Sequence, residues 1–413
     1  MLRVFTKGLP RGLLDIEDKR RSNLFAWRGQ FSPQLIESLL EAYCPDGAVV
    51  LDPFAGSGTV LHEAARLSMA AYAFEVNPAA WAFSKTYEFA NLSADERETA
   101  IAELRSHLEA HFPIVLFSAE ALSLAEVESK VMEIGPQLSN HAKVLLNALV
   151  ILLDLANNRL TIELVQSRFL ALAEMVRNLP YSRQPVKADL QDARALPLED
   201  GTVGFVVTSP PYINVFNYHQ NYRRSAEALG WDLLRVARSE IGSNRANRGN
   251  RFHTVVQYCV DMAAVLAELS RILEDDGRVV LVVGHESRVL RVPFYNAQIM
   301  AQIAERSGAF SLVLRQERIF TNRFGMAIRE DILNMVKSPR RSAADLAQVA
   351  RSVARGALEA GRRLATGKNS ALLSDAIERS GDIQGTPIFN SRTYRHYQTR
   401  EEVMMVNEQE RQA

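Results

Sequence analysis

Three short segments of the sequence carry residues whose types and spacing suit chemistry on a bound ligand. The first is DPFAGSGT, residues 52–59, in which a short apolar strand ends at an acid and a turn with Gly56 and Gly58 leads into a helix. Glycines at such a turn let backbone N–H groups approach a ligand closely at a helix N-terminus. The pattern differs from GxGxxG and from the phosphate loop GxxxxGK[ST], which disfavours a nucleoside triphosphate. Alone, it also fits an ordinary strand-to-helix turn.

The other two segments are an acid and a double proline. Glu75 ends the next apolar strand, 23 positions after Asp52, and an acid at that distance suits the hydroxyls of a ribose. In TSPPY, residues 208–212, two prolines fix the backbone and remove two N–H donors. Carbonyl acceptors, a serine hydroxyl and the Tyr212 ring remain, which suits a planar ring bearing an amino group. The alternative interpretations are that Glu75 is a solvated loop residue and that TSPPY is a strand cap with a packed tyrosine.

The hydrophobic pattern around these segments predicts the elements that must position them. Helical spacing of apolar residues covers 33–43, and apolar strands end at Asp52 and Glu75. Further strands are predicted at 204–209, 277–284, 310–320 and 329–337, and helices at about 60–67, 255–273 and 297–307. This alternation indicates an α/β fold with a mostly parallel sheet that ends in an antiparallel hairpin.

The chain divides by composition into four parts. Residues 1–90 hold the first half of the α/β pattern, residues 91–184 form a helical insertion, residues 185–337 form the second half, and residues 338–413 form a basic helical extension. The net charge is zero, with 48 basic and 48 acidic residues, which argues against a uniformly positive surface but allows a local basic face. Segment 217–253 has seven arginines against three acids, and segment 93–133 has nine acids against three bases.

The two cysteines, Cys44 and Cys259, provide no disulfide framework and no cysteine-based zinc site, so no metal is predicted. The N-terminus lacks the apolar core of a signal peptide. The longest apolar run, residues 144–155, is too short to span a bilayer and predicts a buried helix. We therefore expect a cytoplasmic protein with no membrane partner.

Together, DPFAGSGT, the following acid and TSPPY resemble the motifs of the DNA amino-methyltransferases, enzymes that use S-adenosylmethionine to methylate cytosine N4 or adenine N6. The resemblance covers roughly residues 23–90 and 185–337. It implies a Rossmann-like class I methyltransferase fold with a seven-stranded sheet. The serine of SPPY is more similar to the cytosine-N4 branch, whereas an aspartate there is commoner among adenine enzymes. The family's usual acid at the start of the strand is here Gly204.

The resemblance also implies roles for individual residues. For the cofactor, residues 52–59 would surround the methionine part, Glu75 would bind the ribose, and Asn77 would lie near the adenine. Asp192 would contact the adenine amine, with Asp189 as the weaker candidate, and Phe31 and Ser32 would reach the carboxylate. The implied cofactor residues are Phe31, Ser32, Asp52, Pro53, Phe54, Gly56, Ser57, Gly58, Thr59, Glu75, Asn77 and Asp192. The implied base-pocket residues are Ser209, Pro210, Pro211 and Tyr212.

The resemblance leads to a functional hypothesis with open alternatives. The amine would attack the methyl group directly, without a covalent intermediate, and the target base would leave the double-stranded DNA to reach the pocket. The predicted DNA contacts follow TSPPY and are Arg223, Arg245, Arg248 and Arg251. The leading hypothesis is a cytosine-N4 enzyme of a modification system, with a partner restriction endonuclease. The alternatives are an adenine-N6 enzyme, an RNA guanine-N2 methyltransferase, and a non-catalytic binding module.

Overall fold

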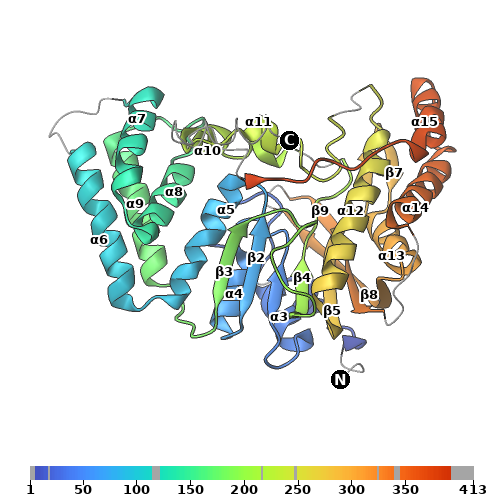
Figure 1. Cartoon of the computed structure of the whole chain (residues 1–413), viewed down its shortest axis with the longest axis horizontal. Helices are drawn as coiled ribbons and strands as arrows, with labels where there is room; N and C mark the ends of the chain where they lie inside the picture. Colours follow the sequence, from blue (N-terminus) through green and yellow to red (C-terminus); the bar gives the residue numbers. More distant parts are fainter. Residues whose placement is uncertain are drawn as a thin grey trace, which may run out of the picture.

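A seven-stranded sheet forms the centre of the molecule (Figure 1). The computed structural model describes residues 5–16, 19–113, 121–214, 217–245, 249–322, 325–338 and 345–391. The strands are β1 (Val50–Asp52), β2 (Ala71–Glu75), β3 (Val186–Leu190), β4 (Val203–Thr208), β5 (Leu273–Gly284), β8 (Phe310–Thr321) and β9 (Ala327–Lys337). Their order is β3-β2-β1-β4-β5-β9-β8. The first five strands run parallel, and β9 is antiparallel to both of its neighbours. The predicted parallel sheet with a terminal hairpin is confirmed.

The central strands of the sheet are covered by a separate apolar layer on each face, since successive side chains of a strand point to opposite faces. Val50 belongs to one core cluster and Leu51 to the other. The first layer receives α3 (Pro33–Tyr43), α4 (Thr59–Arg66) and α5 (Pro78–Lys85). The second receives α12 (His253–Ile272), α13 (Asn296–Arg306) and α14 (Leu346–Gly361). Burial on both faces explains why β4 is continuously apolar.

Four longer helices follow 3-10 helix η1 (Thr86–Asn91) and stand at one side of the sheet in Figure 1. They are α6 (Ala94–His111), α7 (Leu124–Ile134), α8 (Asn140–Leu153) and α9 (Ile162–Arg177), with 3-10 helix η2 (Gly135–Gln137) after α7. Capping boxes begin two of them, Ser93 with Glu96 and Ser123 with Glu126. The buried Arg97 donates to backbone carbonyls just after α9, including that of Pro180 at 3.1 Å, and so satisfies acceptors at that helix end.

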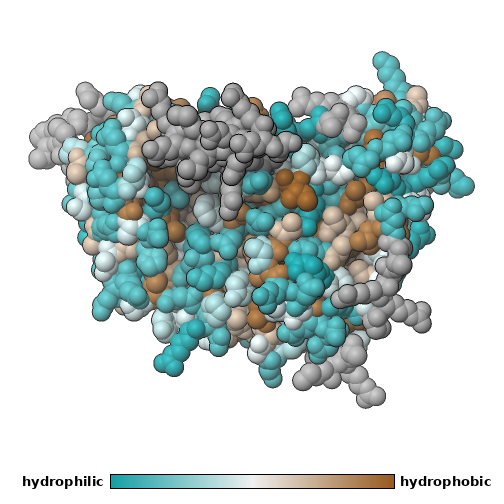
Figure 2. All heavy atoms as spheres, viewed as in Figure 1, coloured by the Kyte–Doolittle hydropathy of each residue, from teal (hydrophilic) through white to brown (hydrophobic). Residues whose placement is uncertain are grey.

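Short elements and the C-terminal part complete the fold. They are α2 (Arg11–Asp15), η3 (Tyr218–Gln220), α10 (Arg223–Ala228), α11 (Leu233–Val236), the hairpin β6 (Ser287–Val289) and β7 (Val292–Phe294), α15 (Lys368–Glu378) and η4 (Arg379–Gly381). Residues 382–391 then run back over the sheet in an extended conformation (Figure 1). The face shown in Figure 2 is mostly hydrophilic, with apolar residues exposed only in small patches. None of the helices described has the length and apolar content needed to cross a membrane.

Candidate active site

The glycine turn connects β1 to the N-terminus of α4, as the sequence predicts. Gly56 and Gly58 adopt left-handed conformations, with φ of 51° and 90°. A Cβ atom on Gly58 would lie 2.6 Å from the ring carbons of Tyr87, so only glycine fits there. The turn is also tied to the N-terminal segment, because the Ser57 hydroxyl donates to Gln30 Oε1 at 3.0 Å.

Phe31 and Ser32 lie close to this turn through a shared asparagine. Asn23 accepts a 2.8 Å hydrogen bond from the Thr59 hydroxyl, and its amide donates to the carbonyl of Phe31 at 2.8 Å. Ser32 directly precedes α3, and its hydroxyl makes no capping hydrogen bond with that helix. The structure therefore brings residues 31 and 32 together with the turn, although they lie more than 20 positions apart in sequence.

Glu75 ends β2 and faces the same turn. Its Oε2 accepts from the Gly56 N–H at 2.9 Å, and its Oε1 accepts from the N–H groups of Val76 and Asn77 at 3.0 and 2.9 Å. Burial raises the pKa of Glu75, and these three hydrogen bonds oppose that rise. A carboxylate offers four acceptor positions, so one on Oε2 is left for a ligand hydroxyl.

Asp52 connects the glycine turn to the TSPPY segment. Its Oδ1 accepts from the Phe54 N–H at 3.0 Å and from the Thr208 hydroxyl at 2.6 Å. The side chain is buried, and burial raises the pKa of Asp52 to about 7. Pro53 is buried beside it, and Phe54 packs against the second core cluster. Adjacent parallel strands β1 and β4 thus place the two motifs side by side.

Asp192 lies just after the carboxyl end of β3, and Asn77, two positions after Glu75, is the N-cap of α5. The carboxylate of Asp192 is buried and forms a salt bridge with Arg194 at 2.7 Å. Its Oδ2 also accepts the backbone N–H of Phe389 at 2.8 Å. The Asn77 amide donates to the carbonyl of Tyr218 at 3.0 Å, which joins this edge to the loop after TSPPY.

The TSPPY residues lie at the end of β4. The hydroxyls of Ser209 and Tyr212 are 3.4 Å apart. Pro210 is buried, whereas Ser209, Pro211 and Tyr212 are partly exposed. The serine hydroxyl and the aromatic ring therefore share one small region next to Asp52.

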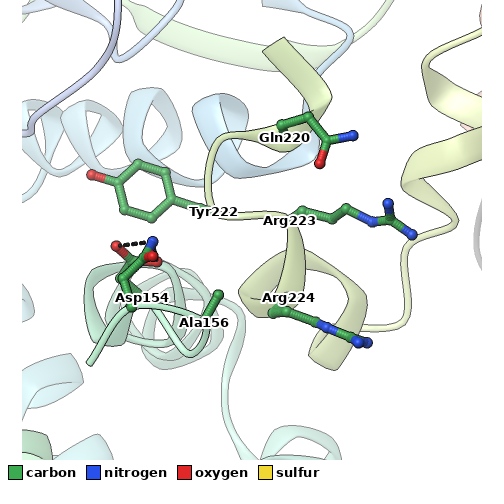
Figure 3. Close-up of a pocket in the computed structure, with 7 residues that line it drawn as sticks. Asp154, Ala156, Gln220, Tyr222, Arg223 and Arg224 are labelled. Carbon is green, nitrogen blue, oxygen red and sulfur yellow. Dashed lines mark hydrogen bonds between the residues drawn. The ribbon is translucent and has the colours of Figure 1, made fainter. Parts of the chain in front are cut away.

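A polar cavity of about 360 Å³ lies between the end of α8 and the loop after TSPPY (Figure 3). Arg223 and Arg224 line it and point away from Tyr222 and Asp154. Both arginines pair with Glu227, at 2.6 and 3.4 Å. The predicted DNA contact Arg223 is therefore partly neutralised within its own helix, α10.

The other predicted DNA contacts have different surroundings. Arg245 is partly buried and donates to the carbonyl of Ala237 at 3.0 Å, and its second nitrogen lies 3.1 Å from His219 Nε2. Arg251 is exposed and bonds to Asn214, two positions after Tyr212. Arg248 lies outside the described residues.

The sequence motifs did not reveal several residues that shape this site. Asn23 and Gln30 hold the glycine turn, and Arg194 holds Asp192. The Trp27 ring stacks on Tyr222 at 6.1 Å and would lie 3.3 Å from a Cβ on Gly56. Asparagine and glutamine before a helix, or an arginine two positions after an acid, are common patterns in sequences, so they carry little signal.

The strand order and the position of these residues define the class of protein. A mostly parallel open sheet with Asp52, Glu75, Asp192 and the TSPPY residues at or just after the carboxyl ends of β1, β2, β3 and β4 is a Rossmann-like α/β fold, and folds of this kind bind ligands beside those strand ends. Residues 13–85, which contain the glycine turn and Glu75, match the family model described as DNA methylase. This segment of the chain is therefore similar to the N4/N6 DNA amino-methyltransferases, enzymes whose methyl donor is S-adenosylmethionine.

Comparisons with whole proteins add little beyond the fold. No curated protein matches the chain in sequence. A methyltransferase from Methanosarcina mazei is 10% identical, covers 73% of this chain and 98% of its own, and has a TM-score of 0.34. The rRNA methyltransferase aviRa from Streptomyces viridochromogenes is 14% identical over 79% of this chain and 90% of its own, with a TM-score of 0.31. Scores this low carry no argument about function, so the class assignment depends on the strand order and the matched segment.

Proposed function

We propose that the protein methylates the exocyclic N4 amine of cytosine in DNA. The proposal depends on the hydrogen bond of 2.6 Å that the Thr208 hydroxyl donates to Asp52. It joins the glycine turn, proposed to bind the methyl donor, to TSPPY, proposed to bind the base. The serine of SPPY supports cytosine over adenine through the family resemblance. Adenine N6 is the competing target within the same family.

The residues at the sheet edge suit S-adenosylmethionine. A side chain at position 58 would collide with Tyr87, so glycine there lets the turn stay tight. Glu75 keeps one acceptor position for a ribose hydroxyl. We assign the methionine part to residues 52–59 with Phe31 and Ser32, and the adenine end to Asn77 and Asp192. When bound, S-adenosylmethionine supplies an electrophilic methyl group.

The chain's own residues would act by positioning and electrostatics. An amine on an aromatic ring is a poor nucleophile, because its lone pair is delocalised into the ring. The Ser209 hydroxyl and the Pro210 carbonyl would accept hydrogen bonds from the amine, which favours a more pyramidal nitrogen. Tyr212 would stack on the base and fix its plane, so that the amine is held in line for transfer. No nucleophilic cysteine is needed, and Cys259 is buried in α12 with its pKa raised by burial.

The proposed substrate is double-stranded DNA, with the target base rotated out of the helix. Arg251 and the cavity at Arg223 and Arg224 follow the base pocket in the chain, which supports a role in contacting phosphates there. Arg245 supports this role less, because it bonds to the protein's own backbone.

A product analysis tests the proposal. The protein is incubated with labelled S-adenosylmethionine and mixed genomic DNA, which is then digested to nucleosides and separated. We expect label in N4-methylcytosine. Label only in N6-methyladenine would contradict the cytosine assignment, and label only in RNA would contradict DNA as the substrate.

A further inference from the structure

Glu330 lies on β9, in the antiparallel hairpin that no motif marks, and reaches the base-pocket tyrosine. The Tyr212 hydroxyl donates to Glu330 Oε1 at 3.1 Å, and the same hydroxyl lies 3.4 Å from Ser209 Oγ. We propose that Glu330 is a positioning residue of the reaction, which fixes the Tyr212 ring in the plane where the target base stacks. The inference rests on the proposed function of TSPPY.

Two contacts together determine the orientation of the Tyr212 ring. One side of the ring packs on Gly284, the last residue of β5, where a Cβ would lie 2.8 Å from Cε2. The tip of the ring is held by Glu330. A tyrosine side chain turns about two torsion angles, so a contact along the ring and a second at its hydroxyl leave one orientation. The ring is then preorganised before a base arrives.

The register of the hairpin puts Glu330 in this position. Gly284 pairs with Glu330 across β5 and β9, and Arg318 pairs with Glu330 across β8 and β9. Gly284 therefore contacts the Tyr212 ring, and Glu330 on the neighbouring strand accepts the hydrogen bond from the hydroxyl of the same tyrosine. A shift of one residue in this register would turn Glu330 to the other face of the sheet.

A buried arginine supports the glutamate. Arg318 is 4% exposed, its Nε lies 3.5 Å from Glu330 Oε2, and its guanidinium lies 4.4 Å from the centre of the Phe320 ring. Burial raises the pKa of Glu330, and the positive charge of Arg318 opposes that rise. Buried ion pairs add little net stability compared with apolar residues of similar size. We therefore infer that this ion pair serves to orient the neighbouring Tyr212 side chain rather than to stabilise the fold.

A double-mutant cycle separates positioning from a structural role. Because removing the charge of Glu330 alone leaves Arg318 buried and unpaired, the main variant replaces both residues, R318M with E330M, and R318M/E330Q serves as the conservative variant. Each is prepared with Tyr212 and with Tyr212→Phe. The readouts are kcat and KM for methyl transfer to mixed DNA, the Kd for S-adenosylmethionine by calorimetry, and thermal unfolding. Glu317→Gln, on the same hairpin and paired with Arg329 near the surface, is the control.

We expect R318M/E330M to lower kcat/KM roughly 10- to 100-fold, which is the change expected when a hydrogen bond to a charged group is lost. R318M/E330Q should retain more activity, since an amide oxygen still accepts from the tyrosine. The cofactor Kd should stay unchanged, and neither change should lower activity further in the Tyr212→Phe background. Independent losses in that background, or full activity of R318M/E330M, would overturn the inference. A wild-type protein that transfers no methyl group would overturn the proposed function, and with it this inference.

Discussion

The backbone N–H of Phe389 donates a 2.8 Å hydrogen bond to Asp192, across 197 positions of the chain. Arg194 supplies the other three donors to the same carboxylate, from its backbone N–H at 3.0 Å, Nε at 2.9 Å and one terminal nitrogen at 2.7 Å. A carboxylate offers about four acceptor positions, so all of them are filled. Arg194 also donates to the carbonyls of Thr386 and Pro387 at 2.9 and 3.0 Å. Residues 386–389 are therefore held at the acid that the family resemblance assigns to the adenine amine.

The first prediction concerns the amide of Phe389. If Asp192 accepts the adenine amine, that donor must replace the Phe389 N–H, because the three Arg194 donors come from a neighbour in the chain. We expect hydrogen exchange at the Phe389 amide to be slow in the free protein and to accelerate when S-adenosylmethionine is added. The amide of Thr386, which donates to Asp261 at 2.8 Å, is the internal control. Unchanged exchange at Phe389 with saturating cofactor would remove Asp192 from the cofactor site.

The second prediction is a pH dependence of stability that comes from Asp52. Burial raises its pKa to about 7 from an ordinary value of 3.8, so the folded protein holds this proton more tightly than the unfolded chain does. The resulting stabilisation is complete below a pH of about 4 and is lost as the pH rises through about 7. For this shift the change is about 4 kcal/mol, at 1.36 kcal/mol per pKa unit.

Asp52→Asn tests this pH dependence, because asparagine keeps an acceptor oxygen but cannot ionise. Urea unfolding between pH 5 and pH 8 should show a smaller loss of stability in the variant than in the wild type. Part of the slope should persist, since the pKa values of Asp261 and Glu75 are also raised by burial. Asp46→Asn, at an exposed position, should follow the wild-type curve. Parallel curves for Asp52→Asn and the wild type would show that Asp52 is ionised throughout.

Much of the fold could be predicted from the sequence, because its signals are local. Continuous apolar runs such as residues 203–208 are typical of strands buried on both faces, and the glycine turn marks the strand-to-helix connection. The alternation of strands and helices and the terminal hairpin follow from those patterns, whereas the seven-stranded sheet is what the family resemblance implies. The structure adds that β1 and β4 are adjacent and parallel, which places the glycine turn beside TSPPY.

The remaining site contacts depend on long-range packing, for which a single sequence has no periodic signal. Glu330 meets Tyr212 only because of the register of β9 on β5, and Phe389 meets Asp192 only because the chain returns after α15. The prediction of Arg245 as a DNA contact depended on the arginine-rich composition of its segment and on the position of that segment after TSPPY. Composition does not reveal that its Nε donates to the backbone of Ala237.

The third prediction concerns Gly58. Alanine there would be strained by its φ of 90° and would bring Cβ within 2.9 Å of the Ser84 Cα and closer still to Tyr87. We expect the free energy of unfolding to fall by about 1–3 kcal/mol and cofactor binding to weaken, since the turn must move. Gly47→Ala is the matched control, because Gly47 also has a positive φ of 73° but has nothing within 4 Å of its Cβ position. Equal losses in the two variants, measured by urea unfolding, would show that crowding at Tyr87 has no effect.

The last prediction separates the base pocket from the cofactor site. Tyr212→Ala removes the stacking surface but leaves the glycine turn and Glu75 intact, so we expect methyl transfer to fall roughly 5- to 150-fold, the value of one base–aromatic stack. The Kd for S-adenosylmethionine should stay near that of the wild type. Asp52→Ala should instead weaken the binding of S-adenosylmethionine, because it releases the Phe54 N–H and the Thr208 hydroxyl that shape the turn. Tyr181→Ala, at a tyrosine that is 59% exposed, is the control and should match the wild type in both readouts. Normal turnover by Tyr212→Ala would show that the ring does not stack on the base.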